Sequence, residues 1–154
     1  MPDSEKQVLL QLMDDTRLRI ENLLPQIDAH LEIYPGWTIR EVMEHVAGWD
    51  DAAIATLRAH LEDKPLSTPE IRNLDEYNAM SISSRSGMED EQILTEWRSK
   101  RGILRKMIEE FPEFKFETPF LVPWGGKSTV TEMMEMFCEH EDSHTRDIQK
   151  LLQN

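Results

Sequence analysis

The chain has 154 residues and carries 30 acidic residues against 17 basic ones, which gives a formal net charge of −13. A surface this negative repels phosphate backbones and anionic lipids, so nucleic-acid and membrane partners are not expected. No apolar run approaches the ~20 residues of a membrane helix, and the acidic N-terminus does not resemble a signal peptide. The single cysteine, Cys138, excludes an intramolecular disulfide. These features predict one cytoplasmic domain over residues 1–154.

Hydrophobic residues recur with the helical period in four segments, and no segment alternates convincingly with period two. The first helix is expected from about Ser4 to His30, with a capping box at its start and a kink or break at Pro25. Pro35-Gly36 predicts a turn. A second capping box then opens the second helix, expected over residues 39–62.

Residues 65–87 form a long connection, in which Thr68-Pro69-Glu70 predicts the start of one short helix. The third long helix is expected over residues 89–110. Residues 111–127 contain three prolines and a glycine pair and predict an irregular loop, and a capping box at Thr129 opens the last helix. Four amphipathic helices predict an all-α four-helix bundle. The short first connection favours antiparallel packing of the first two helices, and the long second connection can cross the bundle.

Residues 140–144 read His-Glu-Asp-Ser-His and match the H-E-x-x-H pattern. His140 and His144 lie in the middle of the apolar stripe of the last helix, where core residues are expected. His45 lies near the edge of the stripe of the second helix, so a bundle can bring it against this pair. Three neutral imidazoles with an open fourth position are typical of a catalytic site for zinc, nickel or a similar ion. The alternative is a set of hydrogen-bonded core histidines.

The match to a metalloprotease motif does not predict a metalloprotease. Such enzymes take a third ligand downstream of the motif, and Asp147 lies on the same helix, where it can at most support a ligand by a hydrogen bond. Glu141 is a candidate general base beside a metal-bound water, but an ordinary solvated glutamate is the favoured interpretation. Cys138 is expected to be a small buried thiol, and His30 and His60 are expected to be surface or capping residues.

Two stretches of the chain contain short motifs in a characteristic order. The first has Pro35-Gly36-Trp37-Thr38, then His45 and Ala47-Gly48-Trp49-Asp50. The second has Pro123-Trp124-Gly125-Gly126, then the histidine pair His140 and His144, then Asp147-Ile148. Together they resemble the DinB-like (YfiT-like) family, and Asn78 in the connection between them resembles its DfsB-like branch, which includes the colibactin self-resistance proteins.

This resemblance implies a four-helix bundle with up-down-down-up topology and a long crossover between the second and third long helices. It also implies a divalent metal ion, often nickel or zinc, held by His45, His140 and His144, and frequently a homodimer. Some relatives are transferases or isomerases that use a low-molecular-weight thiol, and others resemble hydrolases that detoxify reactive small molecules. We therefore expect a metal-dependent hydrolase or thiol transferase with a small-molecule substrate. The alternative is a non-catalytic bundle that binds or sequesters a small molecule without metal.

Overall fold

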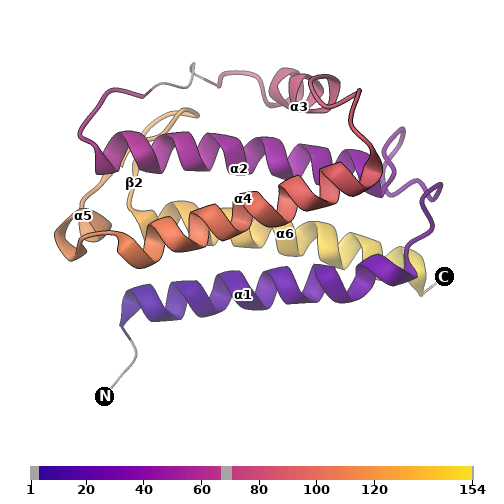
Figure 1. Ribbon diagram of the computed structural model, residues 1–154, viewed down its shortest axis with the longest axis horizontal. Helices are drawn as coiled ribbons and strands as arrows, with labels where there is room; N and C mark the ends of the chain where they lie inside the picture. The colour runs from indigo at the N-terminus through magenta and orange to yellow at the C-terminus, as the bar shows by residue number, and fades with distance from the viewer. Residues whose placement is uncertain (1–3, 67–70, 154) are drawn as a thin grey trace.

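A computed structural model describes residues 4–66 and 71–153 and shows four long helices lying side by side (Figure 1). The long helices are α1 (Glu5–Leu23), α2 (Ile39–Leu61), α4 (Asp90–Glu110) and α6 (Val130–Leu152). The connections contain a 3-10 turn η1 (Leu24–Gln26), two short helices α3 (Leu74–Ser83) and α5 (Glu113–Glu117), and two short strands β1 (Phe120–Leu121) and β2 (Lys127–Ser128). The prediction of an all-α four-helix bundle is confirmed.

The four long helices run up, down, down and up, as the family resemblance implies. In Figure 1, α1 and α6 run in one direction, α2 and α4 run in the other, and the crossover carrying α3 returns along the outside of α2. The helix α1 packs mainly against α6, and α2 packs mainly against α4. The prediction that the first two long helices pack against one another is therefore wrong: they are antiparallel, but they lie on a diagonal of the bundle.

Side-chain caps fix where the helices begin. Ser4, Thr38 and Thr129 each form the predicted capping box, and Glu89 forms another at the start of α4. The helix α1 is shorter than predicted, because Pro25 lacks the N–H that a helix interior needs and the chain passes into the 3-10 turn there. The expected break at this proline is confirmed.

The first connection makes a tight turn beside the bundle. Tyr34 and Trp37 form an isolated β-bridge, and Gly36 between them has a φ of +79°, a conformation that glycine adopts without steric strain. The turn predicted at Pro35-Gly36 is confirmed. Because of this turn, the aromatic rings of Tyr34 and Trp37 lie against the end of the bundle rather than in an extended loop.

The other two connections contain more structure than the sequence suggested. The short helix of the second connection begins at Leu74 and is capped by Asn73, whereas the predicted start at residues 68–70 lies outside the described residues. Residues 111–127 are not wholly irregular, because they contain α5 and an antiparallel pair between β1 and β2. His60 is half-buried rather than a surface residue, because its ring stacks on Phe120 with centroids 4.5 Å apart. Its Nε2 atom lies 2.8 Å from the backbone oxygen of Lys115 in the last turn of α5, as a capping residue would.

A charged layer divides the hydrophobic core into two halves. One half is built around Leu57 and Met133, and the other around Val42 and Ile148. Each long helix contributes one charged side chain that points inward between the two halves. This charged layer consists of Arg17, Asp50, Arg101 and Glu141.

Among residues 4–66 and 71–153, no helix combines the length and the apolar character that a membrane crossing requires.

Candidate metal centre

Three histidine side chains from two helices meet inside the bundle. His45 comes from α2, and His140 and His144 come from successive turns of α6. The Nε2 atom of His140 lies 3.0 Å from Nε2 of His45 and 3.0 Å from Nε2 of His144. Among the described residues, these three form the group of potential metal ligands, with one ligand atom from each within 4.8 Å of the others. The sequence prediction that they converge is therefore fulfilled, and their binding of a metal stays a prediction.

Asn78 on α3 sets the tautomer of His45. The Asn78 Oδ1 atom accepts a hydrogen bond from the indole Nε1 of Trp49 at 2.9 Å, and an indole nitrogen can only donate. The same oxygen lies 2.8 Å from Nδ1 of His45, so Nδ1 must carry the proton that it donates. This leaves the Nε2 atom of His45 with a free lone pair that faces the other two histidines.

Tyr34 sets the tautomer of His144 in the same way. The Tyr34 hydroxyl donates its hydrogen to the Asp147 carboxylate at 2.6 Å, and burial together with Asp147 raises the pKa of the phenol. Its oxygen lies 2.7 Å from Nδ1 of His144, so Nδ1 donates to it. Asp147 thus supports His144 indirectly, through the hydroxyl of Tyr34. This is the supporting role that the sequence analysis allowed for it. A supporting carboxylate of this kind fixes ring orientation and tautomer in metal sites.

Burial keeps the imidazoles neutral. Desolvation and the neighbouring His140 and His144 lower the pKa of His45 to about 3. Desolvation, with a further contribution from His140, lowers the pKa of His144 to about 4. The pKa of His140 is also lowered, mainly by burial. At neutral pH these side chains are therefore in the form that binds metal ions.

The donor set fits a divalent cation. The Nε2–H of His140 can point at one of the two lone pairs that face it, which leaves the other without a partner. A cation between the three rings, with Nε2 of His140 deprotonated, would accept a lone pair from each of the three Nε2 atoms. Ligand nitrogens around a tetrahedral zinc lie roughly 3.3 Å apart, given Zn–N bonds of about 2.0–2.1 Å, and two of the spacings here are 3.0 Å.

Glu141 neither faces the histidine nitrogens nor lies in solvent. It is fully buried, and its carboxylate accepts from Arg101 at 2.5 Å and from Arg17 at 3.2 Å. The interpretation as a solvated glutamate is wrong, because arginines on α4 and α1 reach the carboxylate inside the core. Paired in this way, Glu141 offers no free carboxylate to a water at the histidines. Cys138 is buried as expected, and burial raises the pKa of its thiol.

A cavity of about 330 Å³ opens beside His45 and His140. Its walls come from α2, α3, α6 and the loop between β1 and β2, and they include Trp49, Trp124 and Phe137. The rings of Trp49 and Trp124 meet edge to face, with centroids 5.9 Å apart. This cavity gives the histidine cluster access to a small molecule.

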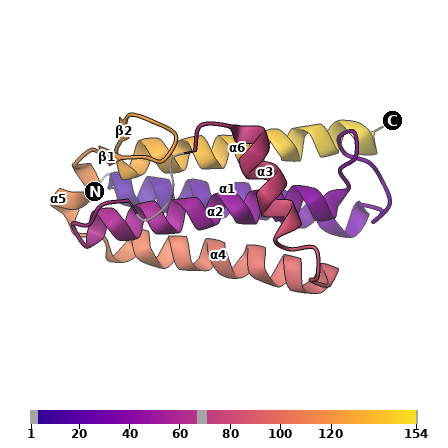
Figure 2. The same ribbon diagram turned by 90° about the horizontal axis from the view of Figure 1, so that it is seen from above.

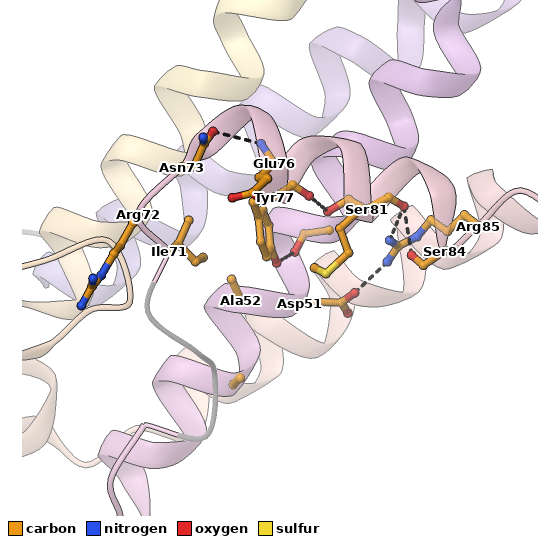
Figure 3. Close-up of a pocket in the computed structure, with 13 residues that line it drawn as sticks. Asp51, Ala52, Ile71, Arg72, Asn73, Glu76, Tyr77, Ser81, Ser84 and Arg85 are labelled. Carbon is orange, nitrogen blue, oxygen red and sulfur yellow. Dashed lines mark hydrogen bonds and ion pairs between the residues drawn. The ribbon is translucent and has the colours of Figure 1, made fainter.

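A larger cavity of about 800 Å³ lies against a different face of α3 (Figure 3). Two of its charged side chains are paired, because Arg85 donates to Asp51 at 2.7 Å (Figure 3). Arg85 also donates to Glu96, outside the lining, at 2.6 Å. The Tyr77 hydroxyl donates to the backbone oxygen of Gly48 at 2.5 Å. Among the described residues, its lining contains no group of three potential metal ligands. The smaller cavity is therefore the better candidate for a catalytic site.

The fold and the site define a four-helix bundle in which three histidines of α2 and α6 meet beside the crossover helix α3. The chain belongs to the family of the mycothiol maleylpyruvate isomerase N-terminal domain, whose family model matches residues 9–149. The resemblance to DinB-like proteins is thereby confirmed. No curated protein matches the chain by sequence.

Two solved structures share the fold. The first is YfiT from Bacillus subtilis, a probable metal-dependent hydrolase with an unusual four-helix bundle topology. It has a TM-score of 0.73 at 17% identity, over 98% of this chain and 88% of YfiT. The second is the mycothiol-dependent maleylpyruvate isomerase, with a TM-score of 0.76 at 17% identity. That match covers 96% of this chain but 61% of the isomerase, so this chain spans less than two thirds of its length.

Proposed function

We propose that the protein is a metal-dependent enzyme that acts on a small molecule, with a divalent ion held by His45, His140 and His144. The observation that carries the proposal is the convergence of three Nε2 atoms, two of them with tautomers fixed from outside by Asn78 and Tyr34. Zinc and nickel suit such a set of imidazoles. The description of YfiT as a probable metal-dependent hydrolase supports the same class of activity.

The ion would lower the pKa of a water or a thiol in its open position and so supply a nucleophile near neutral pH. Hydrolysis and thiol transfer share this step. Asn78 and Tyr34 keep the Nε2 atoms of His45 and His144 unprotonated and hold these two rings in place. Trp49, Trp124 and Phe137 form the wall of the cavity beside them. The family's mycothiol-dependent isomerase supports a low-molecular-weight thiol as a co-substrate.

One feature favours the alternative of a non-catalytic binding bundle. Among the described residues, the cavity lining offers histidines and an asparagine but no carboxylate, lysine or tyrosine to move a proton. A protein that sequesters a small molecule needs no such group, whereas a hydrolase commonly uses one.

Metal content tests the proposal. Protein purified without an affinity tag is expected to contain about one zinc or nickel ion per chain by elemental analysis, and His140→Ala is expected to lose it. His30→Ala, which removes an exposed histidine outside the cluster, is the matched control and should keep its metal. Absence of metal after incubation with zinc and with nickel, together with unchanged stability on chelation, would contradict the proposal.

The type of reaction requires a second measurement. A cobalt-substituted form allows the open coordination position to be observed by absorption spectroscopy. A thiol that binds the ion is expected to produce a sulfur-to-cobalt charge-transfer band. An unchanged spectrum with low-molecular-weight thiols would favour hydrolysis over thiol transfer.

A further inference from the structure

Trp49 takes part in two features of the site at once. Its ring forms part of the cavity wall, and its indole nitrogen donates to Asn78, which also accepts from His45. We propose that Trp49 is a positioning residue for the histidine cluster: its N–H fixes the orientation of the Asn78 amide and thereby holds the ring proton of His45 on Nδ1. This inference rests on the proposed function, because the role of Trp49 is to keep Nε2 of His45 available to the ion.

An asparagine amide presents a different group when it is turned over. In the observed orientation the oxygen of Asn78 faces Nδ1 of His45 at 2.8 Å and accepts its hydrogen. In the other orientation the NH₂ group would face Nδ1, which would then have to accept, and the ring proton would move to Nε2. That proton would occupy the lone pair that faces the other two histidines. The orientation of one amide therefore decides whether His45 can bind an ion through Nε2.

The indole of Trp49 excludes the second orientation. An indole nitrogen can only donate, and it lies 2.9 Å from Oδ1 of Asn78. A turned amide would place its NH₂ group against the indole N–H, so that two donors would face one another without an acceptor. Asn78 is half-buried, and among the described residues its amide nitrogen has no hydrogen-bond partner that could fix the orientation instead. The indole N–H is thus the group that distinguishes the two orientations.

The packing of α3 on α2 keeps the three side chains together. His45 and Trp49 lie one turn apart on α2, so a single oxygen beside them can reach both. The ring of Tyr77 packs on the indole with centroids 4.7 Å apart, and its hydroxyl donates to the backbone oxygen of Gly48 at 2.5 Å. These contacts join the chain neighbours of Asn78 and Trp49 and so anchor both partners of the hydrogen bond.

The same arrangement is needed with and without a bound ion. An ion held by Nε2 of His45 leaves the ring proton on Nδ1, and this is the nitrogen that donates to Asn78. In the metal-free protein the same hydrogen bond keeps the ring in the form that binds an ion. Loss of the indole N–H should therefore change the tautomer of the metal-free protein and weaken the binding of metal.

Trp49→Phe tests the inference, because it removes the N–H and keeps an aromatic ring in the cavity wall. In metal-free protein, ¹⁵N NMR of the imidazoles reports which ring nitrogen is protonated. The Nε2 signal of His45 is expected to move from the position of a bare nitrogen toward that of a protonated one. Zinc affinity in chelator competition should fall about threefold or more. The loss should stay below the roughly 10- to 100-fold that follows removal of a direct partner, because the amide still adopts the accepting orientation part of the time.

Trp124→Phe is the matched control. Trp124 belongs to the same cavity wall, and among the described residues the hydrogen bonds of Asn78 go to His45 and Trp49. This variant should leave the His45 signal and the zinc affinity nearly unchanged. An unchanged Nε2 signal in Trp49→Phe, or equal losses of zinc affinity in the two variants, would overturn the proposal.

A change at position 78 separates positioning from packing. Asn78→Asp replaces the amide by a carboxylate, which accepts through both oxygens and has no donor to present while it is ionised. In this background, Trp49→Phe should no longer move the His45 signal and should cost less zinc affinity than in the unaltered chain. A loss of the same size in both backgrounds would mean that Trp49 acts through packing alone and would refute the positioning role.

Metal content measured on the same samples separates this inference from the proposed function. A chain that takes up no metal, but in which Trp49→Phe still moves the His45 signal, would refute the proposed function and leave the control of the tautomer by Trp49 intact. A chain with stoichiometric metal and an unchanged signal would refute the role of Trp49 alone.

Discussion

Loss of the Glu141 charge is expected to destabilise the protein strongly. The charged layer contains two arginines and two carboxylates, so its net charge is zero, and Glu141 makes the shortest contacts in it. Glu141→Gln would leave Arg17 and Arg101 with Asp50 alone, whose oxygens lie 3.8 and 3.9 Å from them. Breaking a buried ion pair by removing one partner costs roughly 3–5 kcal/mol, and we expect a loss in that range.

Urea unfolding at pH 7.5, on metal-free protein, provides the measurement. The control is Asp142→Asn, at the next position of the same helix and also paired with an arginine of α1. Arg19 in this pair is 47% exposed. An exposed pair of this kind contributes about 0–1 kcal/mol. Equal losses of unfolding free energy in the two variants would refute the argument from burial.

A second substitution tests the charge count. Arg101→Met alone leaves a net negative layer, whereas Glu141→Gln combined with Arg101→Met restores neutrality with Arg17 facing Asp50. The double variant should therefore be destabilised by less than the sum of the single effects, by roughly 1–3 kcal/mol. A strictly additive result would show that the two charges do not compensate one another.

Further variants probe the contacts around the site. Gly48→Ala places a Cβ atom 2.1 Å from the hydroxyl oxygen of Ser81 on α3, and we expect it to lower the free energy of unfolding by about 1–3 kcal/mol. Gly102→Ala adds a Cβ atom in open space and should not destabilise the protein. Urea unfolding measures both variants. Tyr34→Phe removes the partner of His144 Nδ1 and should weaken metal binding roughly 10- to 100-fold in chelator competition. Acidification should destabilise the metal-free protein from pH 6.5 down to about 3. Burial lowers the pKa of His45 to about 3 and of His144 to about 4, so the unfolded chain binds protons that the folded chain excludes. His144→Gln should make this loss shallower in urea titrations at several pH values.

Local signals in the sequence predicted where the long helices begin, but not which helices pack against one another. Capping boxes and helical periodicity depend on residues a few positions apart, so the starts of the long helices were found correctly. The partners of α1 and α2 depend on how the 15 residues from Leu24 to Thr38 cross the end of the bundle, which no periodic pattern encodes. Short elements such as β1 and α5 carry too few residues for a pattern to emerge.

The histidines of the site were predictable, and their supports were not. His140 and His144 lie on the apolar stripe of α6, and two polar side chains on such a stripe are a signal that can be read from the sequence of this helix alone. The role of Tyr34 depends on the β-bridged turn that carries it to α6, and a lone tyrosine in a connection gives no such signal. Glu141 was misinterpreted because acidic residues on a helix usually face solvent, and its arginine partners lie more than thirty residues away in sequence.

The crossover helix has a consequence for how such a protein can diversify. The three nitrogens come from long helices that the hydrophobic core fixes, whereas Leu74, Asn78 and Trp124 come from connections between those helices. Connections tolerate exchange better than core helices do. Replacement of α3 and the loop between β1 and β2, with the acceptor for His45 Nδ1 retained at position 78, can therefore give the same histidine cluster a different ligand preference while the bundle stays unchanged.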